Sequence, residues 1–157
     1  MGFSHLNDKG QAMMVDVSEK QVSHRTATAR SIVSLPAEVL EQLTEGDIQT
    51  KKGSVFQTAI IAGIMAAKKT GDLIPLCHPL GLDNCQVIIQ LNEKQEVVID
   101  CTASITAKTG VEMEALVGAS IAALTVYDMC KALSHDIVIK ETKLIKKTGG
   151  KRDFKRA

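Results

Sequence analysis

The longest apolar segment of the sequence spans residues 115–126, where Ser120 and Thr125 are the only polar side chains. Charged residues flank it on both sides, which predicts a helix of about residues 109–131. A helix that is apolar on every face cannot lie on the surface of a small domain, because its side chains would face water. We therefore expect this helix to be covered on all sides, with a second copy of the chain as part of the cover.

The two ends of the predicted helix carry its ionisable groups. Thr109 is followed three residues later by Glu112, the spacing of a capping box, so capping is one explanation of Glu112. Glu114 has no comparable explanation and needs a partner. Asp128 and Lys131 are three residues apart and therefore neighbours on one helix face. Two interpretations of this pair stay open. It is either an ordinary surface ion pair or an acid–base pair at the rim of a buried contact.

The other elements follow from shorter patterns. Alternation and β-branched residues predict strands at residues 25–35, 86–91, 96–103 and 136–144, the middle two forming a hairpin. Helices are predicted at residues 37–43 and 54–69, and the two prolines within residues 73–80 predict a stiff loop. The order is that of the split βαβ unit. We predict an α+β, ferredoxin-like fold, an antiparallel sheet with helices packed on one face.

The length of 157 residues suits a single domain covering residues 1–157. Residues 1–24 are mostly polar and predict a mobile N-terminal arm, with docking on the rest of the chain or on a neighbour left open. Residues 146–157 form a basic, glycine-containing tail. The longest apolar run is too short to cross a bilayer, so we expect a soluble protein.

Composition excludes several classes of partner. The net charge is +1 and aromatic residues are 3% of the chain, so we expect neither nucleic acid nor a membrane as a partner. The four cysteines form no C-x-x-C pair, which argues against a structural zinc site. Because the N-terminus shows no signal pattern, we expect reduced thiols and a cytoplasmic location.

Several basic residues suit phosphate binding. Lys52 precedes Gly53 at a predicted helix start, where backbone N–H groups attract anions. Lys147 lies close to the glycine pair at residues 149–150, which leaves backbone amides accessible. Solvated surface lysines are the alternative. The residues alone predict an oligomer that binds a small phosphorylated ligand, with acid–base catalysis as an open option.

Six segments together resemble one known family. They are residues 14–18 (MVDVS), 52–53 (KG), 73–80 (LIPLCHPL), 108–116 (KTGVEMEAL), 127–132 (YDMCKA) and 149–151 (GGK). In this order they resemble the molybdenum cofactor biosynthesis protein C family, the cyclic pyranopterin monophosphate synthases, over nearly the full chain. Two departures are Ala107 in place of a glycine and a tail one residue shorter before Asp153.

The resemblance implies a ferredoxin-like protomer in a hexamer, a trimer of dimers with active sites at the dimer contact. It also implies a lyase that converts a cyclised dihydro-GTP (3′,8-cyclo-7,8-dihydro-GTP) into cyclic pyranopterin monophosphate and releases pyrophosphate. No metal or other cofactor is implied, and magnesium escorting the triphosphate stays open. A non-catalytic, nucleotide-sensing regulatory module of the same fold is the alternative.

The resemblance also assigns roles to particular residues. Asp128 and Lys131 match the acid–base pair, and Lys52 matches a catalytic lysine. The residues expected to bind substrate are Leu76, Cys77, His78, Glu112, Met113 and Glu114, with Arg25 and Lys147 near the triphosphate.

Overall fold

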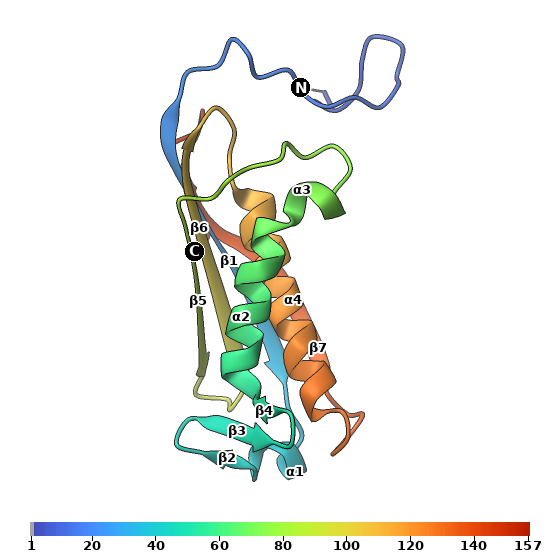
Figure 1. Ribbon diagram of the computed structural model, residues 1–157, viewed down its shortest axis with the longest axis vertical. Helices are drawn as coiled ribbons and strands as arrows, with labels where there is room; N and C mark the ends of the chain where they lie inside the picture. The colour runs from blue at the N-terminus through green and yellow to red at the C-terminus, as the bar shows by residue number, and fades with distance from the viewer. Residues whose placement is uncertain (1) are drawn as a thin grey trace.

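A five-stranded antiparallel sheet forms one layer of the computed structural model, which describes residues 2–157 (Figure 1). Its strands are β1 (Ser23–Ser34), β5 (Asn84–Leu91), β6 (Val97–Ala107), β7 (Val138–Thr148) and β8 (Phe154–Lys155). They lie in the order β5-β6-β1-β7-β8. Apart from the short β8, this is the strand order of a split βαβ fold. The predicted α+β, ferredoxin-like class is confirmed.

Two long helices form the second layer. α2 (Val55–Lys68) and α4 (Glu112–Cys130) lie side by side over one face of the sheet (Figure 1). The short helices α1 (Ala37–Leu40) and α3 (Thr70–Leu73) sit before and after α2 in the chain. A small sheet of β2 (Leu43–Thr44), β3 (Asp47–Thr50) and β4 (Gly53–Ser54) connects α1 to α2.

Small residues let α2 and α4 approach each other closely. A Cβ atom placed on Gly63 of α2 would lie 2.9 Å from the carbonyl oxygen of Gly118 of α4. A Cβ atom on Gly118 would lie 2.5 Å from Cys101 Sγ, on the sheet beneath. The alanines of α4 that face inward, such as Ala119 and Ala122, are fully buried. The core is therefore built on close backbone approach, with few large side chains at its centre.

Several predicted elements need correction. α1 ends at Leu40, because Glu45 and Gly46 have positive φ and form the two-residue turn of a hairpin that pairs Leu43 with Ile48. α4 begins at Glu112, three residues later than predicted, and β7 continues to Thr148. The small sheet and α3 were not predicted, since their strands and helix have only two to four residues each.

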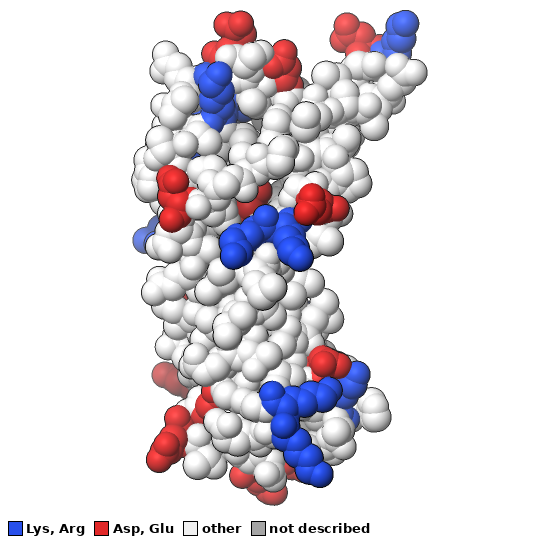
Figure 2. Space-filling model, in the orientation of Figure 1, with Lys and Arg blue, Asp and Glu red and all other residues white. Residues whose placement is uncertain are grey.

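The expectation that α4 needs cover on every side is met largely within one chain. α2 and the sheet bury eight of its residues. A single chain therefore covers more of α4 than the sequence indicated. By length and composition alone α4 could cross a membrane, but it packs as a core helix. The outer faces of α2 and α4 still expose Ile61, Met65 and Leu124. Figure 2 shows this stretch as an uncharged surface between two groups of charged side chains.

Gly118→Ala tests the close helix contact. Alanine favours a helix by about 1 kcal/mol over glycine, but overpacking here should cost more than that gain. We expect a net loss of about 1–2 kcal/mol in the free energy of unfolding, measured by urea denaturation. Gly81→Ala is the control, because its added Cβ meets nothing within 4 Å. A stabilised Gly118→Ala protein would contradict the packing described.

Candidate functional site

Two cavities lie at opposite ends of α4. The first, the N-end cavity, has a volume of about 410 Å³ and lies beside the start of the helix. The second, the C-end cavity, has a volume of about 510 Å³ and lies beside its end. The predicted substrate-binding residues all line the N-end cavity: Arg25, Leu76, Cys77, His78, Glu112, Met113, Glu114 and Lys147. The predicted catalytic residues all line the C-end cavity: Lys52, Asp128 and Lys131.

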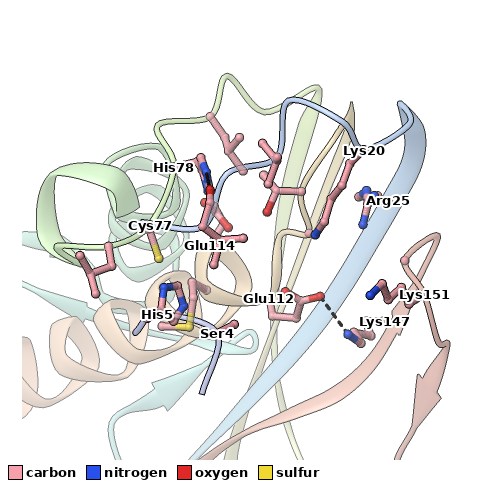
Figure 3. A pocket seen from close by; sticks show the side chains of 18 residues that line it. Ser4, His5, Lys20, Arg25, Cys77, His78, Glu112, Glu114, Lys147 and Lys151 are labelled. Atoms are coloured by element: carbon pink, nitrogen blue, oxygen red, sulfur yellow. Dashed lines mark hydrogen bonds and ion pairs between the residues drawn. The ribbon is translucent and has the colours of Figure 1, made fainter. Parts of the chain in front are cut away.

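One wall of the N-end cavity combines the proline-containing loop with the first turn of α4. Cys77 and His78 from the loop lie near Glu114 (Figure 3). Glu114 is only 4% exposed, and this burial raises the pKa of its carboxyl, with the charge of Glu112 acting in the same direction. Burial also raises the pKa of the Cys77 thiol. This wall therefore favours the protonated forms of its acid and its thiol.

The opposite wall is basic. Arg25 is on β1 and Lys147 on β7, and because Lys147 pairs with Ala27, two residues from Arg25, both side chains face the helix layer. Lys20 and Lys151 join them along this wall (Figure 3). Arg25 Nε donates a hydrogen bond to the carbonyl of Ala107 at 3.2 Å. Four cations from separate parts of the chain thus meet at one side of the cavity.

Glu112 faces this basic wall. Its Oε1 lies 3.5 Å from Lys147 Nζ (Figure 3). The capping explanation of Glu112 is wrong, because Val111, not Thr109, is the N-cap residue and no side chain caps the helix. Glu112 is the first residue of α4, and its carboxylate is therefore available to the cavity.

The N-terminal arm forms part of the same cavity. The carbonyl of Val15 accepts a hydrogen bond from His78 Nε2 at 2.7 Å, and the carbonyl of Ser18 accepts one from Lys108 Nζ at 3.1 Å. These contacts bring His5 and Lys20 to the cavity lining. Sequence reasoning missed both residues because the polar arm has no pattern that shows which part of the domain it contacts. The only signal was the family-like segment at residues 14–18.

Asp128 and Lys131 form the predicted pair at the C-end cavity, with 2.7 Å between Asp128 Oδ1 and Lys131 Nζ. The hydrogen bond from Lys131 lowers the pKa of Asp128, and the same bond raises the pKa of Lys131. In this arrangement Lys131 is held protonated and Asp128 ionised. Lys52 enters the cavity from the turn between β3 and β4, and its charge also lowers the pKa of Asp128.

The two groups stay apart within one chain. Glu114 and Asp128 are fourteen residues apart on α4, which corresponds to about 21 Å along the helix axis. Figure 1 shows the helix straight and its two ends at distant parts of the molecule. A single small ligand in one cavity of this chain cannot contact both groups.

Comparisons with known proteins identify the family. A model of the MoaC family matches residues 14–150. The chain belongs to the MoaC family. A cyclic pyranopterin monophosphate synthase of Xanthomonas campestris pv. campestris (strain 8004) is 55% identical over 152 residues, covering 97% of this chain and 92% of the relative. The assignment made from the six sequence segments is therefore confirmed.

Longer relatives contain the same family region. A molybdenum cofactor biosynthesis bifunctional protein of Synechocystis is 52% identical over 155 residues, covering 96% of this chain and 45% of the relative. Molybdenum cofactor biosynthesis protein 1 of Dictyostelium discoideum is 49% identical over 166 residues, covering 95% of this chain and 26% of the relative. In these proteins a MoaC-like region forms part of a larger chain.

Glu114→Gln tests the electrostatics of the N-end cavity. Because the folded-state pKa of Glu114 is raised, the folded protein binds this proton more tightly than the unfolded chain. The contribution of Glu114 to stability is therefore greatest at low pH and declines as pH rises from the unfolded pKa through the folded one. Glutamine is neutral at every pH.

We expect the melting temperature of Glu114→Gln, relative to wild type, to increase as pH is raised from 4 to 8. Glu112→Gln is the control, since the carboxylate of Glu112 lies beside Lys147 and is less buried. A difference between Glu114→Gln and wild type that does not change with pH would contradict the assignment.

Proposed function

We propose that this chain is a cyclic pyranopterin monophosphate synthase, a lyase that converts 3′,8-cyclo-7,8-dihydro-GTP into cyclic pyranopterin monophosphate and releases pyrophosphate. Family membership and the names of the relatives support this proposal. The observation that carries it is the division of the expected site residues into two complete sets, one in each cavity beside α4. One set suits binding of a triphosphate and the other suits proton transfer.

The N-end cavity fits a nucleotide-derived triphosphate. Its basic wall, with Arg25 and Lys147, would face the phosphates and offset their negative charge. Its other wall, with Cys77, His78 and Glu114, would face the ring system. A protonated Glu114 can donate a hydrogen bond to a ring carbonyl or nitrogen, which an ionised carboxylate cannot do.

The C-end cavity supplies the proton-transfer groups. Opening and closing rings derived from purine and ribose requires proton transfers at several atoms. In this pair Lys131 carries the proton, and Asp128 keeps its ammonium group in place. Cyclisation of the phosphate forms one oxygen–phosphorus bond and breaks the bond to the departing pyrophosphate. The proposal needs no resident cofactor, and magnesium would enter only with the triphosphate.

We propose that two copies of the chain build each active site. An antiparallel copy of α4 across a two-fold axis places the start of one helix beside the end of the other. The exposed Ile61, Met65 and Leu124 form an apolar contact surface for this arrangement. A trimer of such dimers gives the proposed hexamer, and the proposed location is the cytoplasm.

Asp128→Asn and Lys131→Ala test the chemical role of this pair. Both side chains are half exposed, so their interaction should contribute little to stability, and we expect melting temperatures within about 3 °C of wild type. Turnover, measured as pyrophosphate release from the cyclised dihydro-GTP, should fall by at least about 100-fold. Lys143→Ala, which breaks another exposed ion pair on the sheet, is the control.

Substantial turnover by either variant would exclude the proposed acid–base role. If wild type binds the nucleotide but releases no pyrophosphate, the nucleotide-sensing module is the better explanation.

Complementation tests the shared site. Glu114→Ala and Asp128→Asn proteins should each be inactive alone, because every site then contains one damaged component. When the two are co-expressed, mixed dimers contain one site with neither change and should regain part of the wild-type turnover. Co-expression of Asp128→Asn with Lys131→Ala is the control. Each of the two sites in such a mixed dimer contains one damaged component, so activity should not return. If verified mixed oligomers of the first pair stay inactive, the antiparallel arrangement is wrong.

A further inference from the structure

Asp47, at the start of β3, joins three parts of the chain near Lys52. Its Oδ1 accepts hydrogen bonds from the backbone N–H groups of Ile48 at 2.7 Å and Phe56 at 2.8 Å. Its Oδ2 accepts a hydrogen bond from the hydroxyl of Ser54. One carboxylate thus links the first strand of the β3–β4 hairpin, its last residue and the first turn of α2. This is more than an N-cap requires, because Ser54 already accepts from Gln57 at the start of α2.

The environment of Asp47 keeps it in the form that makes these bonds. Burial opposes ionisation, but the hydrogen bonds from Ser54, Phe56 and Ile48 outweigh it and lower the pKa of the carboxyl. At neutral pH the carboxylate can therefore accept all three bonds at once.

The hairpin presents Lys52 at its tip. Thr50 pairs with Gly53, so Lys51 and Lys52 are the two turn residues between them. Gly53 has a φ of +109°, and Thr50 Oγ1 accepts from the N–H of Lys52 at 3.1 Å and donates to the carbonyl of Gly53 at 3.0 Å. The tip is therefore fixed relative to the hairpin, and the direction of Lys52 depends on how the hairpin is held against the helices.

Asp47 provides that attachment. Through Phe56 it ties the hairpin to α2, and α2 packs along α4, whose end carries Asp128 and Lys131. Ile48, next to Asp47, is 1% exposed and also lines the C-end cavity. The path from Lys52 to Asp128 through the structure thus includes the Asp47 carboxylate.

We propose that Asp47 is a positioning residue for the reaction, holding the β3–β4 hairpin so that Lys52 faces Asp128 and Lys131. This inference rests on the proposed function, in which Lys52 takes part in the chemistry. Asp47 itself does not line the C-end cavity. Its effect would be exerted through the hairpin.

The kinetic test compares two substitutions of Asp47. Asp47→Ala removes all three bonds, and we expect kcat to fall about 10- to 100-fold, because a small misplacement of a catalytic group has an effect of this size. KM should change little, since the basic wall belongs to the other cavity. Asp47→Asn keeps an oxygen for Ile48 and Phe56 and can donate to Ser54 Oγ, so it should keep most of kcat.

Asn92→Ala is the matched control. Asn92 Oδ1 accepts hydrogen bonds from the backbone N–H groups of Lys94 at 3.0 Å and Glu96 at 2.9 Å, and so holds the β5–β6 turn as Asp47 holds its hairpin. Asn92 lines neither cavity, and its loss should lower stability without lowering kcat. If Asn92→Ala lowers kcat as much as Asp47→Ala does, the effect is general destabilisation and the proposal is wrong.

Amide hydrogen exchange gives a test that does not depend on turnover. In Asp47→Ala, amides of residues 48–54 should exchange faster, while those of residues 59–67 in α2 keep their wild-type rates. If wild type shows no turnover, the proposed function fails, and the exchange data still decide whether Asp47 holds the hairpin.

Unchanged exchange in the hairpin, or unchanged kcat in Asp47→Ala, would overturn the inference. If Asp47→Ala does not fold, Ser54→Ala replaces it. This change removes one of the three bonds and also the N-cap of α2, so the amide of Gln57 should exchange faster as well. Ser54→Ala should then cause a smaller rise in the exchange of residues 48–54, and no rise there would likewise overturn the inference.

Discussion

The close contact between α2 and α4 is the constraint on which the rest of the structure depends. Gly63 and Gly118 face each other there, and Gly118 also lies against Cys101 of the sheet. With no room for even one methyl group, the two helices and the sheet are fixed as one rigid unit. Each cavity is built where loops meet an end of this unit. The chemistry-bearing loops are therefore placed by a scaffold in which few side chains could change size.

The ends of α4 and the segments that meet them carry different kinds of chemistry. At its start, burial raises the pKa of Glu114 while cations from β1, β7, the arm and the tail gather opposite. At its end, an exposed ion pair keeps Asp128 ionised and Lys131 protonated. The same helix thus provides a buried carboxyl group at its start and a solvent-exposed ion pair at its end. The difference lies in which side chains are buried: Glu114 is buried at the start of α4, whereas at its end Val126 and Cys130 are buried and Asp128 and Lys131 are half exposed.

The sequence predicted the four long strands of the main sheet and both long helices, because each has a periodic pattern or a family-like segment, and their order along the chain indicated the ferredoxin-like class. The predictions were wrong at turns and helix ends, where the conformation of one or two residues decides the structure. The helix predicted at residues 37–43 ends at Leu40, because Glu45 and Gly46 form a tight turn soon after it, and positive φ at Glu45 cannot be foreseen from residue type. Thr109 matched the capping spacing, yet the chain turns into α4 two residues later. His5 and Lys20 reach the cavity through contacts between distant parts of the chain, and the residues next to them in the sequence do not indicate these contacts.

The straight, uninterrupted α4 also constrains how this protein can change through evolution. Inserting one residue into a helix advances everything after it by about 1.5 Å and rotates it by about 100°. An insertion in the middle of α4 would turn Asp128 away from its cavity while leaving Glu114 in place. A loop can accommodate an added residue by changing its path, but in a helix the insertion displaces and rotates every residue that follows it. The segment from residue 112 to residue 131 should therefore tolerate substitutions far better than insertions or deletions.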